Sequence, residues 1–538
     1  MTNTKKSNRL SLPIKLAVVL ILLCLVIFPI LRMFSAMRIE DFEKVLRHPS
    51  FLPALSNSVV LSAIATGIVV LLAYLLAYCM VRTQMPCKKL FHVLLILPML
   101  IPSLSHGMGL IILFGGNGVL KNLLGLENAI YGSVGIVTGS VLYAFPVAYI
   151  MLSDVLKYED LSVYEAADVL GISRGRQFFR LTLPYLKKPL IAAIFCTFSM
   201  IVTDYGVPLM IGGKTKTLSL LMYEEAIGQL DWGKGSVYGL FLLLPAILAF
   251  FSDLLNKERA SGTFVHKPLQ KSGGKLRNAM ALAVCIAVSV FAALPIVAFL
   301  ILAFAKSYPR DMTFTFANVV NTLNRGGVDY LVNSLIIALF TASIGTLLSY
   351  LTAYLTARMK SLTSRIIHLL VLTFMAIPGI VLGLSYVIGF SSTALYGTLA
   401  ILVMANTAHF ISSPYLMMYN TFGKMNENLE AVGTTLGIGR VRMLWDVFVP
   451  QSIGTIAEMF SYLFVNSMMT ISAVAFLART ATKPISLMIN QFEALMQYEC
   501  AAVVSLMILL ANVLVKIAVG TVKALYARRH SRTDLHNV

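Results

Sequence analysis

Residues 164–184 read Tyr-Glu-Ala-Ala-Asp-Val-Leu-Gly-Ile-Ser-Arg-Gly-Arg-Gln-Phe-Phe-Arg-Leu-Thr-Leu-Pro, a polar and basic segment between two apolar runs. A related segment follows 266 residues later, at 430–450: Glu-Ala-Val-Gly-Thr-Thr-Leu-Gly-Ile-Gly-Arg-Val-Arg-Met-Leu-Trp-Asp-Val-Phe-Val-Pro. In register, the i, i+3, i+4 and i+7 positions are apolar or small in both copies: Val163, Ala166, Ala167 and Leu170, then Leu429, Val432, Gly433 and Leu436. Each copy is therefore predicted to form a short amphipathic helix.

Both predicted helices carry the same end signals. Gly171 and Gly437 stand directly after them, where a left-handed residue would stop a helix, and Pro184 and Pro450 follow thirteen residues later. The small residues at 166, 167 and 433 leave room for a close approach to the helix backbone. An ordinary connecting loop would not need this spacing twice, so the duplication predicts two copies of a partner.

The pattern resembles the EAA loop of permease subunits of ABC importers. In the first copy Glu165, Ala166, Ala167, Gly171 and Pro184 match that motif. In the second copy Ala431, Val432 and Gly433 stand where Glu-Ala-Ala would be, and Glu430 lies one position early. The resemblance implies that each segment is a coupling helix that docks in a groove of an ATPase subunit, with Leu170, Leu436, Gly437 and Pro450 as further coupling positions.

Composition independently indicates a membrane protein. The chain is 58% hydrophobic and 12% charged over 538 residues, which is too apolar for a soluble globule. Its net charge of +19 comes from short basic clusters between apolar runs, which indicates membrane topology rather than nucleic-acid binding. The six cysteines form no CxxC pair, so neither a disulfide framework nor a zinc site is predicted.

Apolar runs predict an all-α polytopic membrane protein with about twelve transmembrane helices in two parallel-oriented six-helix repeats. The first run could instead be a signal peptide, but it recurs in the second half with Phe28-Pro-Ile-Leu31 echoed by Leu294-Pro-Ile-Val297. The predicted domains are 1–255, a cytoplasmic linker at 256–278, and 279–538. The predicted spans are 16–31, 57–81, 90–114, 133–152, 189–211, 235–254, 279–304, 333–357, 366–390, 397–417, 454–477 and 501–523.

The basic residues also predict the orientation in the cell (inner or plasma) membrane. With the N-terminus inside, 29 of the 43 Lys and Arg residues fall in cytoplasmic segments and 13 in external ones. The positive-inside rule then places both termini and both EAA-like loops in the cytoplasm.

The chain is not predicted to be an enzyme. Its nearest approach to a phosphate-binding loop is Leu209-Met-Ile-Gly-Gly-Lys-Thr215, with Pro208 in place of the first Gly and an apolar run rather than a strand before it. No metal-ligand cluster or catalytic motif is recognisable, so no cofactor or metal is expected on this chain. ATP and Mg²⁺ are expected on the partner ATPase.

Polar residues inside the spans are candidates for the translocation pathway, because a charge at the bilayer centre costs about 2.5–3.5 kcal/mol on insertion scales. Asp204 lies in a stretch, residues 203–208, that resembles the equivalent stretch of ferric-iron-type permeases. In the second half the candidates are Asn466, Ser467, Thr470 and Ser472, with Thr470 opposite Asp204 in register. Anchoring of helix ends or hydrogen bonding between helices are the alternatives.

The whole pattern resembles a fused permease of a type I ABC importer, of the group that carries ferric iron, thiamine or 2-aminoethylphosphonate. The stretch Ser472-Ala-Val-Ala-Phe-Leu477 favours a phosphonate transporter within that group. The resemblance implies two cytoplasmic ATPase subunits, an external substrate-binding protein and alternating access. A secondary transporter of the major facilitator type is the alternative, but segments 81–89 and 358–365 lack its loop signature. A membrane scaffold without transport is a third class.

Overall fold

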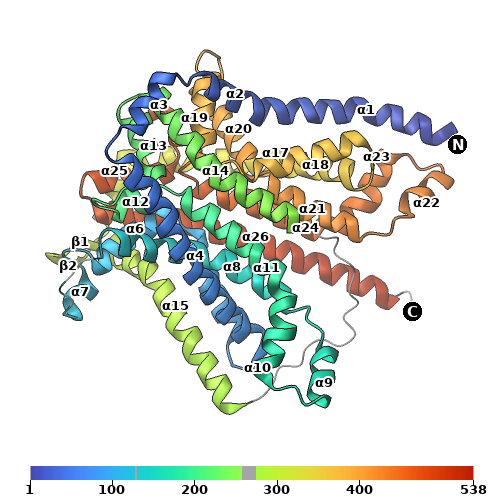
Figure 1. The fold of residues 1–538 in the computed structure, drawn as a ribbon, viewed down its shortest axis with the longest axis horizontal. Helices are drawn as coiled ribbons and strands as arrows, with labels where there is room; N and C mark the ends of the chain where they lie inside the picture. The colour runs from blue at the N-terminus through green and yellow to red at the C-terminus, as the bar shows by residue number, and fades with distance from the viewer. Residues whose placement is uncertain (1, 126, 128–129, 257–273, 537–538) are drawn as a thin grey trace. The chain divides into compact units, whose positions relative to one another are not determined.

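The computed structural model describes residues 2–125, 127, 130–256 and 274–536 and is helical almost throughout (Figure 1). Its helices divide into two compact units that are discontinuous in sequence. Unit 1 comprises residues 1–37, 323–488 and 507–538, and unit 2 comprises residues 38–322 and 489–506. The predicted all-α polytopic fold is confirmed.

Unit 2 contains most of the first sequence half. Its elements are α3 Ile39–Leu46, α4 Phe51–Arg82, α5 Lys88–Ile96, η2 Leu97–Leu100, α6 Ser103–Phe114, α7 Val119–Leu123, α8 Ser133–Leu156, α9 Leu161–Val169, α10 Arg174–Gln177, η3 Phe178–Thr182, α11 Leu183–Val202, α12 Gly206–Ile211, α13 Leu218–Tyr223, η4 Glu224–Gly228, α14 Trp232–Asn256, α15 Lys275–Ala303, β1 Ala305–Ser307, β2 Asp311–Phe314 and α16 Ala317–Thr322. Helix α25 Met488–Ala494 lies almost wholly in this unit, as do the first residues of α26 Tyr498–His536.

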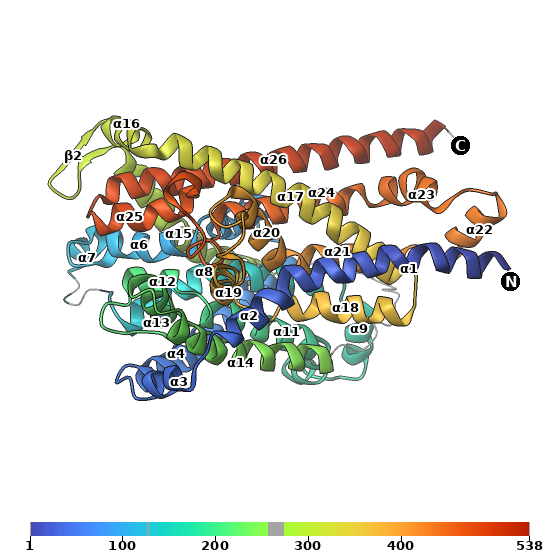
Figure 2. The same cartoon turned by 90° about the horizontal axis from the view of Figure 1, so that it is seen from above.

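Unit 1 contains most of the second half. Its elements are α1 Thr2–Leu22, η1 Leu23–Ile27, α2 Phe28–Ser35, η5 Leu323–Gly327, α17 Val328–Ala357, α18 Leu362–Phe374, α19 Gly379–Phe390, α20 Leu399–Phe410, α21 Ser412–Lys424, α22 Leu429–Thr435, α23 Arg440–Met443, η6 Leu444–Phe448, α24 Val449–Met469, η7 Thr480–Thr482, η8 Ile485–Leu487 and the rest of α26. Figure 2 shows α1 lying along α18, with which it is in contact.

Each unit contains the first span of the other sequence half. In unit 1 the Phe28 and Phe390 rings are 5.6 Å apart, and a Cβ added to Gly389 would lie 3.3 Å from Pro29 Cα. In unit 2 a Cβ added to Gly109 of α6 would clash with Pro295 of α15. The proline of each echoed motif therefore packs against a glycine of a third span. The compact units thus differ from the predicted domains, which follow the repeat along the chain.

Two pairs of equivalent side chains make the same hydrogen bonds in the two units, as the predicted repeat requires. The Asn57 amide donates to the Lys216 carbonyl at 3.0 Å, and Asn333 donates to Lys483 at 3.3 Å. The hydroxyls of the next residues, Ser58 and Ser334, each accept a backbone N–H at 2.7 Å, from Leu218 and Ile485 respectively. The Asn-Ser pair that opens each second span therefore anchors the same kind of loop in both units.

Among the described residues, eight helices are long and apolar enough to cross a membrane, or ten if each bent helix pair is counted as one span. The bent pairs are α18 with α19, at 106°, and α20 with α21, at 50°. These ten correspond to ten of the twelve predicted spans. The other two, 235–254 and 454–477, fall on α14 and α24, and polar residues such as Gln451 and Glu458 lower the hydropathy of α24.

Proline breaks both third spans. Pro102 is the N-cap of α6, directly after the extended residue Ile101, and Pro378 is the N-cap of α19. A proline disfavours helical backbone in the residue before it, so the first helix of each span ends there. The predicted runs 90–114 and 366–390 are therefore two helices each.

Small residues set the packing in the core of unit 2. On α4, Ala65, Ala73 and Ala77 are buried, and on the facing helix α8 so are Ala148 and Tyr149. Alanines at this spacing let two helix backbones approach closely, which is how helices associate in membranes. This packing holds the C-terminal end of α4, with Arg82, close to the loop that follows α8.

Candidate functional site

The first EAA-like segment forms a short capped helix, α9. The Asp160 carboxylate accepts a hydrogen bond from the Ser162 N–H at 2.9 Å and so caps the start. At the end, Gly171 has φ +67°, its N–H donates to the Asp168 carbonyl at 3.0 Å, and the Ile172 N–H donates to the Ala167 carbonyl at 3.0 Å. This is the Schellman arrangement, and the predicted left-handed stop at Gly171 is confirmed.

The second segment ends in the same way. Gly437 has φ +70°, its N–H donates to the Thr434 carbonyl at 3.2 Å, and the Ile438 N–H donates to the Gly433 carbonyl at 2.8 Å. A Cβ added at Gly171 or Gly437 would meet nothing within 4 Å. Glycine is therefore required at both positions for its backbone conformation and not for lack of space.

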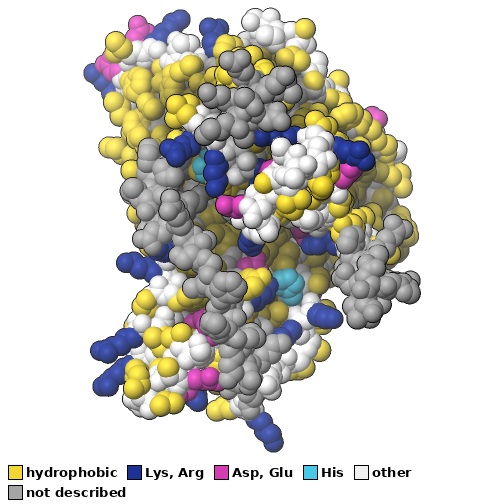
Figure 3. Space-filling view, turned by 90° about the vertical axis from the view of Figure 1, so that its right-hand side faces the viewer, with side chains coloured by type: hydrophobic (Ala, Val, Ile, Leu, Met, Phe, Trp, Pro, Cys, Tyr) yellow, Lys and Arg dark blue, Asp and Glu magenta, His cyan; other side chains and the backbone are white. Residues whose placement is uncertain are grey.

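The predicted apolar faces are largely exposed. Ala167 and Gly433 are buried, whereas the side chains of Leu170, Leu436 and Val432 are 75%, 68% and 54% exposed. Helices α22 and α23 lie on the right-hand side of Figure 1, and Figure 3 shows that side face-on. Apolar side chains are exposed there among Lys and Arg side chains. Each of the two helices thus has apolar side chains that its own chain does not cover, and docking of a partner there stays a prediction.

The small residues on the buried side face their own chain. A Cβ on Gly433 would lie 2.8 Å from Met443 Cε, and Met443 is buried. In the matching position of the first loop, the Gln177 amide donates to the Asp168 carboxylate at 2.6 Å and to the Ile172 carbonyl at 2.8 Å. At Gly433, the close approach predicted from the small residues is therefore made by α23 of the same chain.

An arginine at the end of α4 holds the first loop. Arg82 forms a buried ion pair with Glu159, and its guanidinium lies 5.4 Å from the centre of the Tyr164 ring. The Tyr164 hydroxyl also bonds to Glu159 and lies 2.7 Å from Thr182 Oγ1. Burial, together with the bond to Glu159, raises the pKa of Tyr164, so its hydroxyl keeps its proton at neutral pH.

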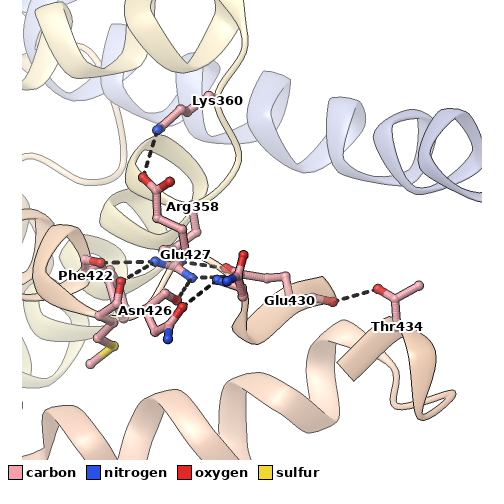
Figure 4. A network of polar contacts seen from close by, with 9 residues as sticks. Arg358, Lys360, Phe422, Asn426, Glu427, Glu430 and Thr434 are labelled. Atoms are coloured by element: carbon pink, nitrogen blue, oxygen red, sulfur yellow. Dashed lines mark hydrogen bonds and ion pairs between the residues drawn. The ribbon is translucent and has the colours of Figure 1, made fainter. Parts of the chain in front are cut away.

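An arginine at the end of α17 holds the second loop (Figure 4). Arg358 donates to both carboxylate oxygens of Glu430, from Nε at 2.6 Å and from Nη2. It also donates to the carbonyls of Met425, at 3.1 Å, and Asn426, at 2.8 Å. Its side chain is 6% exposed and its guanidinium lies 5.4 Å from the centre of the Phe448 ring.

We call these two arrangements the arginine latches. Glu430, one position early in the motif, provides the carboxylate of the second latch, and Glu159, which sequence reasoning missed, provides that of the first. The available signal was the alignment of Arg82 with Arg358 at the ends of the second spans. Glu165, the motif glutamate, is exposed on α9.

Pro184 and Pro450 stand in the first turns of α11 and α24, directly after the π-helical turns η3 and η6. Both prolines lie inside continuous helical runs, because residues 174–202 and 440–469 are helical without a break. Proline has no N–H to donate, and the wider π-helical turn directly before it accommodates the missing hydrogen bond. The two prolines thus mark where each loop re-enters a long helix.

A protein family described as "Binding-protein-dependent transport system inner membrane component" matches residues 69–259 and again residues 345–524. The chain belongs to this family. It therefore carries two permease domains on one polypeptide, as a fused permease of the type I ABC importer class, and it is a multi-pass inner-membrane protein.

Individual relatives align either with most of the chain or with about half of it. The "Ferric transport system permease protein FbpB" of Actinobacillus pleuropneumoniae is 22% identical over 494 residues, covering 87% of this chain and 72% of that protein. The "Sulfate transport system permease protein CysT" of Escherichia coli is 24% identical over 45% of this chain and 90% of its own length. A solved bacterial alginate ABC transporter, in complex with a periplasmic protein bound to an alginate pentasaccharide, covers 50% of this chain at 15% identity and a TM-score of 0.38.

The permease's predicted pathway residues in unit 1 are mostly bonded within the protein. The Asn466 amide donates to the Tyr462 carbonyl at 2.8 Å, and Ser467 Oγ accepts from the Asn406 amide at 2.8 Å. Thr470 is the C-cap of α24. Ser472 lies so close to Gly379 that a Cβ there would clash with its hydroxyl. These bonds favour helix packing, and a pathway role for the four residues stays a prediction.

Asp204 lies at the break between α11 and α12. Its carboxylate accepts the Val207 N–H at 2.9 Å, and the Ser219 hydroxyl donates to its carbonyl at 2.8 Å. The hydroxyl of Ser486 donates to the Thr470 carbonyl in the same way, at 2.9 Å, so the two residues are structurally equivalent. The contacts of Asp204 favour the anchoring alternative. Among the described residues, no group of three or more His, Cys, Asp or Glu could hold a metal ion.

Two substitutions of Asp204 distinguish an anchoring role of its carboxylate from a role in the translocation pathway. Asp204→Asn keeps a side-chain oxygen for the Val207 N–H, so uptake should be unchanged, whereas Asp204→Ala should cost about 1 kcal/mol of stability, the usual cost of losing a cap. Transport and thermal unfolding of both variants provide the measurement. A loss of uptake in Asp204→Asn with normal unfolding would instead assign the carboxylate to the pathway.

Proposed function

We propose that this permease imports ferric iron delivered by an external binding protein, driven by two ATPase subunits docked on the α9 and α22 loops. The observation that carries the proposal is the pair of matched loops. Each presents exposed apolar residues on a Schellman-capped helix, and each is held to the end of a second span by an arginine latch.

The latches provide the mechanical part of the mechanism. A force on a docked loop reaches α4 or α17 through an ion pair and not only through flexible backbone, because Arg82 and Arg358 end those long helices. Closure of two ATPases on ATP would draw the loops together and rearrange the spans, exposing the pathway to the binding protein. This mechanism places both loops and both termini in the cytoplasm, as the basic residues predict.

The choice of ferric iron rests on the extent of similarity. The relative named as a ferric transport permease aligns over 87% of this chain. The phosphonate preference rests on the six residues 472–477 alone. The secondary-transporter alternative is not favoured, because both halves match the binding-protein-dependent permease family.

Iron uptake provides the substrate test. Cells deficient in their own ferric import should take up radiolabelled ferric iron when supplied with this permease, its ATPase and its binding protein. An excess of 2-aminoethylphosphonate should not reduce that uptake. Transport of the phosphonate in place of iron would contradict the proposed substrate and leave the importer assignment intact.

Partnership provides the second test. Because one chain supplies both docking loops, a tagged permease should purify with ATPase at one permease to two ATPase subunits, as measured by native mass spectrometry. Two permease chains per ATPase pair would contradict the fused arrangement.

A further inference from the structure

An apolar groove follows the seam between α4 and α15, both within unit 2. Its volume is about 490 Å³. Leu75, Met280 and Leu276 on its lining are 43%, 62% and 76% exposed, so the groove opens sideways rather than into the core. Tyr78, Thr83 and Val284 also line the groove.

A second apolar groove continues along the same two helices. It has a volume of about 380 Å³, and α4 and α15 line it through Ile68, Leu72, Val288 and Phe291, with α8 on its other side. Within the predicted span, which begins at residue 279, the two grooves together follow α15 from Met280 to Phe291. At 1.5 Å per residue this is about 16 Å, roughly half of a hydrocarbon layer about 30 Å thick. The depth of the two grooves together therefore matches one leaflet.

The mouth of the groove is cationic. Lys275 and Arg277 lie in the first turn of α15, which contains no acidic residue. Opposite them, Lys88 donates to the Met80 carbonyl at 2.6 Å and also to the Thr83 carbonyl.

A hydrogen bond keeps the two sides of the mouth together. The Gln84 N–H donates to the Asn278 side-chain oxygen at 3.0 Å, which joins the segment after α4 to the first turns of α15. The mouth is therefore built by both helices, and Lys275 and Arg277 lie on the lining of the apolar groove.

We propose that this groove binds an anionic phospholipid of the cytoplasmic leaflet, with an acyl chain along Tyr78, Met280 and Val284 and the phosphate at Lys275 and Arg277. Cationic sites between transmembrane helices at this level recognise lipid phosphates, and a water-soluble anion would leave the apolar lining uncovered. The assignment to the cytoplasmic leaflet rests on the orientation given under the proposed function.

Retention of lipid by the complex that purifies with the full-length permease, measured whether or not ATPase is bound to it, tests the site. Native mass spectrometry is carried out with added phosphatidylglycerol or with phosphatidylcholine of the same chain length. The unmodified complex should retain one additional phosphatidylglycerol molecule compared with Lys275→Gln/Arg277→Gln. Phosphatidylcholine retention should be equal in the two. The control Lys360→Gln/Arg365→Gln removes the same charge near the end of α17 and should retain phosphatidylglycerol normally.

A second variant tests the chain-binding part. Val284→Phe keeps both cations but fills the groove, and it should lose the extra phosphatidylglycerol as well. Equal retention of the two lipids by the unmodified complex, normal retention by Lys275→Gln/Arg277→Gln, or displacement of the lipid by glycerol 3-phosphate alone would overturn the proposal. Failure of the transport proposal would appear separately, as absent ATPase or absent iron uptake with lipid retention unchanged.

Discussion

Replacing Gly171 and Gly437 with Val is expected to abolish ATP-driven uptake while leaving insertion of the permease in the membrane intact. Both glycines have left-handed backbone, which costs a residue with a Cβ roughly 1–2 kcal/mol, and a β-branched residue is the least suited to it. Each single change should therefore reduce the population of the docking-competent loop roughly 5- to 30-fold. The double variant should lose uptake and retain little ATPase on purification.

Matched controls separate backbone strain from added bulk. Gly175 and Gly439 lie in the same two loops, and an added Cβ would meet nothing within 4 Å at either, but neither has positive φ. Gly175→Val/Gly439→Val should therefore transport far better than Gly171→Val/Gly437→Val. Gly171→Asn/Gly437→Asn should also retain activity, because asparagine tolerates left-handed backbone. Uptake at the unmodified rate in Gly171→Val/Gly437→Val, with ATPases bound, would show that these helices do not couple ATP to transport.

Removing the guanidinium of the second latch is expected to have the next largest effect. Arg358→Met leaves the Glu430 carboxylate, whose side chain is only 23% exposed, without its bidentate partner, at a cost of about 3 kcal/mol. The carbonyls of Met425 and Asn426 also lose their donor, so the loop before α22 should loosen. Uptake should fall at least tenfold, and limited proteolysis should cut this segment faster.

The same loop provides the control and the rescue. Lys360 and Glu427 form an ion pair at 3.4 Å with side chains 81% and 84% exposed, and such pairs contribute about 0–1 kcal/mol, so Lys360→Met should transport normally. Arg358→Met/Glu430→Met removes both charges and should recover part of the lost uptake. Equal uptake by Arg358→Met and Lys360→Met would mean that the latch transmits no force.

The two latches also explain why the second EAA-like segment can depart from the motif. In the first loop the carboxylate comes from Glu159, before α9, and Tyr164 connects it to the helix. In the second loop the residue in the register of Tyr164 is Glu430, which binds Arg358 directly. A change at one position of the motif is thus compensated by another residue that brings a carboxylate to the equivalent arginine.

The sequence by itself determined the features that depend on neighbouring residues. The left-handed stops at Gly171 and Gly437 could be predicted because backbone conformation is a local property and glycine alone is unpenalised there. The long apolar runs predicted most of the spans, since a run of about 20 apolar residues has few alternatives to crossing a bilayer. The echo of Phe28-Pro-Ile-Leu31 in Leu294-Pro-Ile-Val297 predicted the repeat, and the amides of Asn57 and Asn333 bond to equivalent loops in the two units.

Only the tertiary structure decided which distant residues meet. Arg82 and Glu159 are 77 positions apart, and Arg358 and Glu430 are 72 apart, so no local pattern pairs them. The exchange of first spans between the two units depends on contacts such as Gly389 with Pro29 and Gly109 with Pro295. The packing of Met443 against Gly433 likewise required the fold. Periodicity specifies which face of a helix is apolar, but the partner of that face is chosen by the close packing of the whole chain.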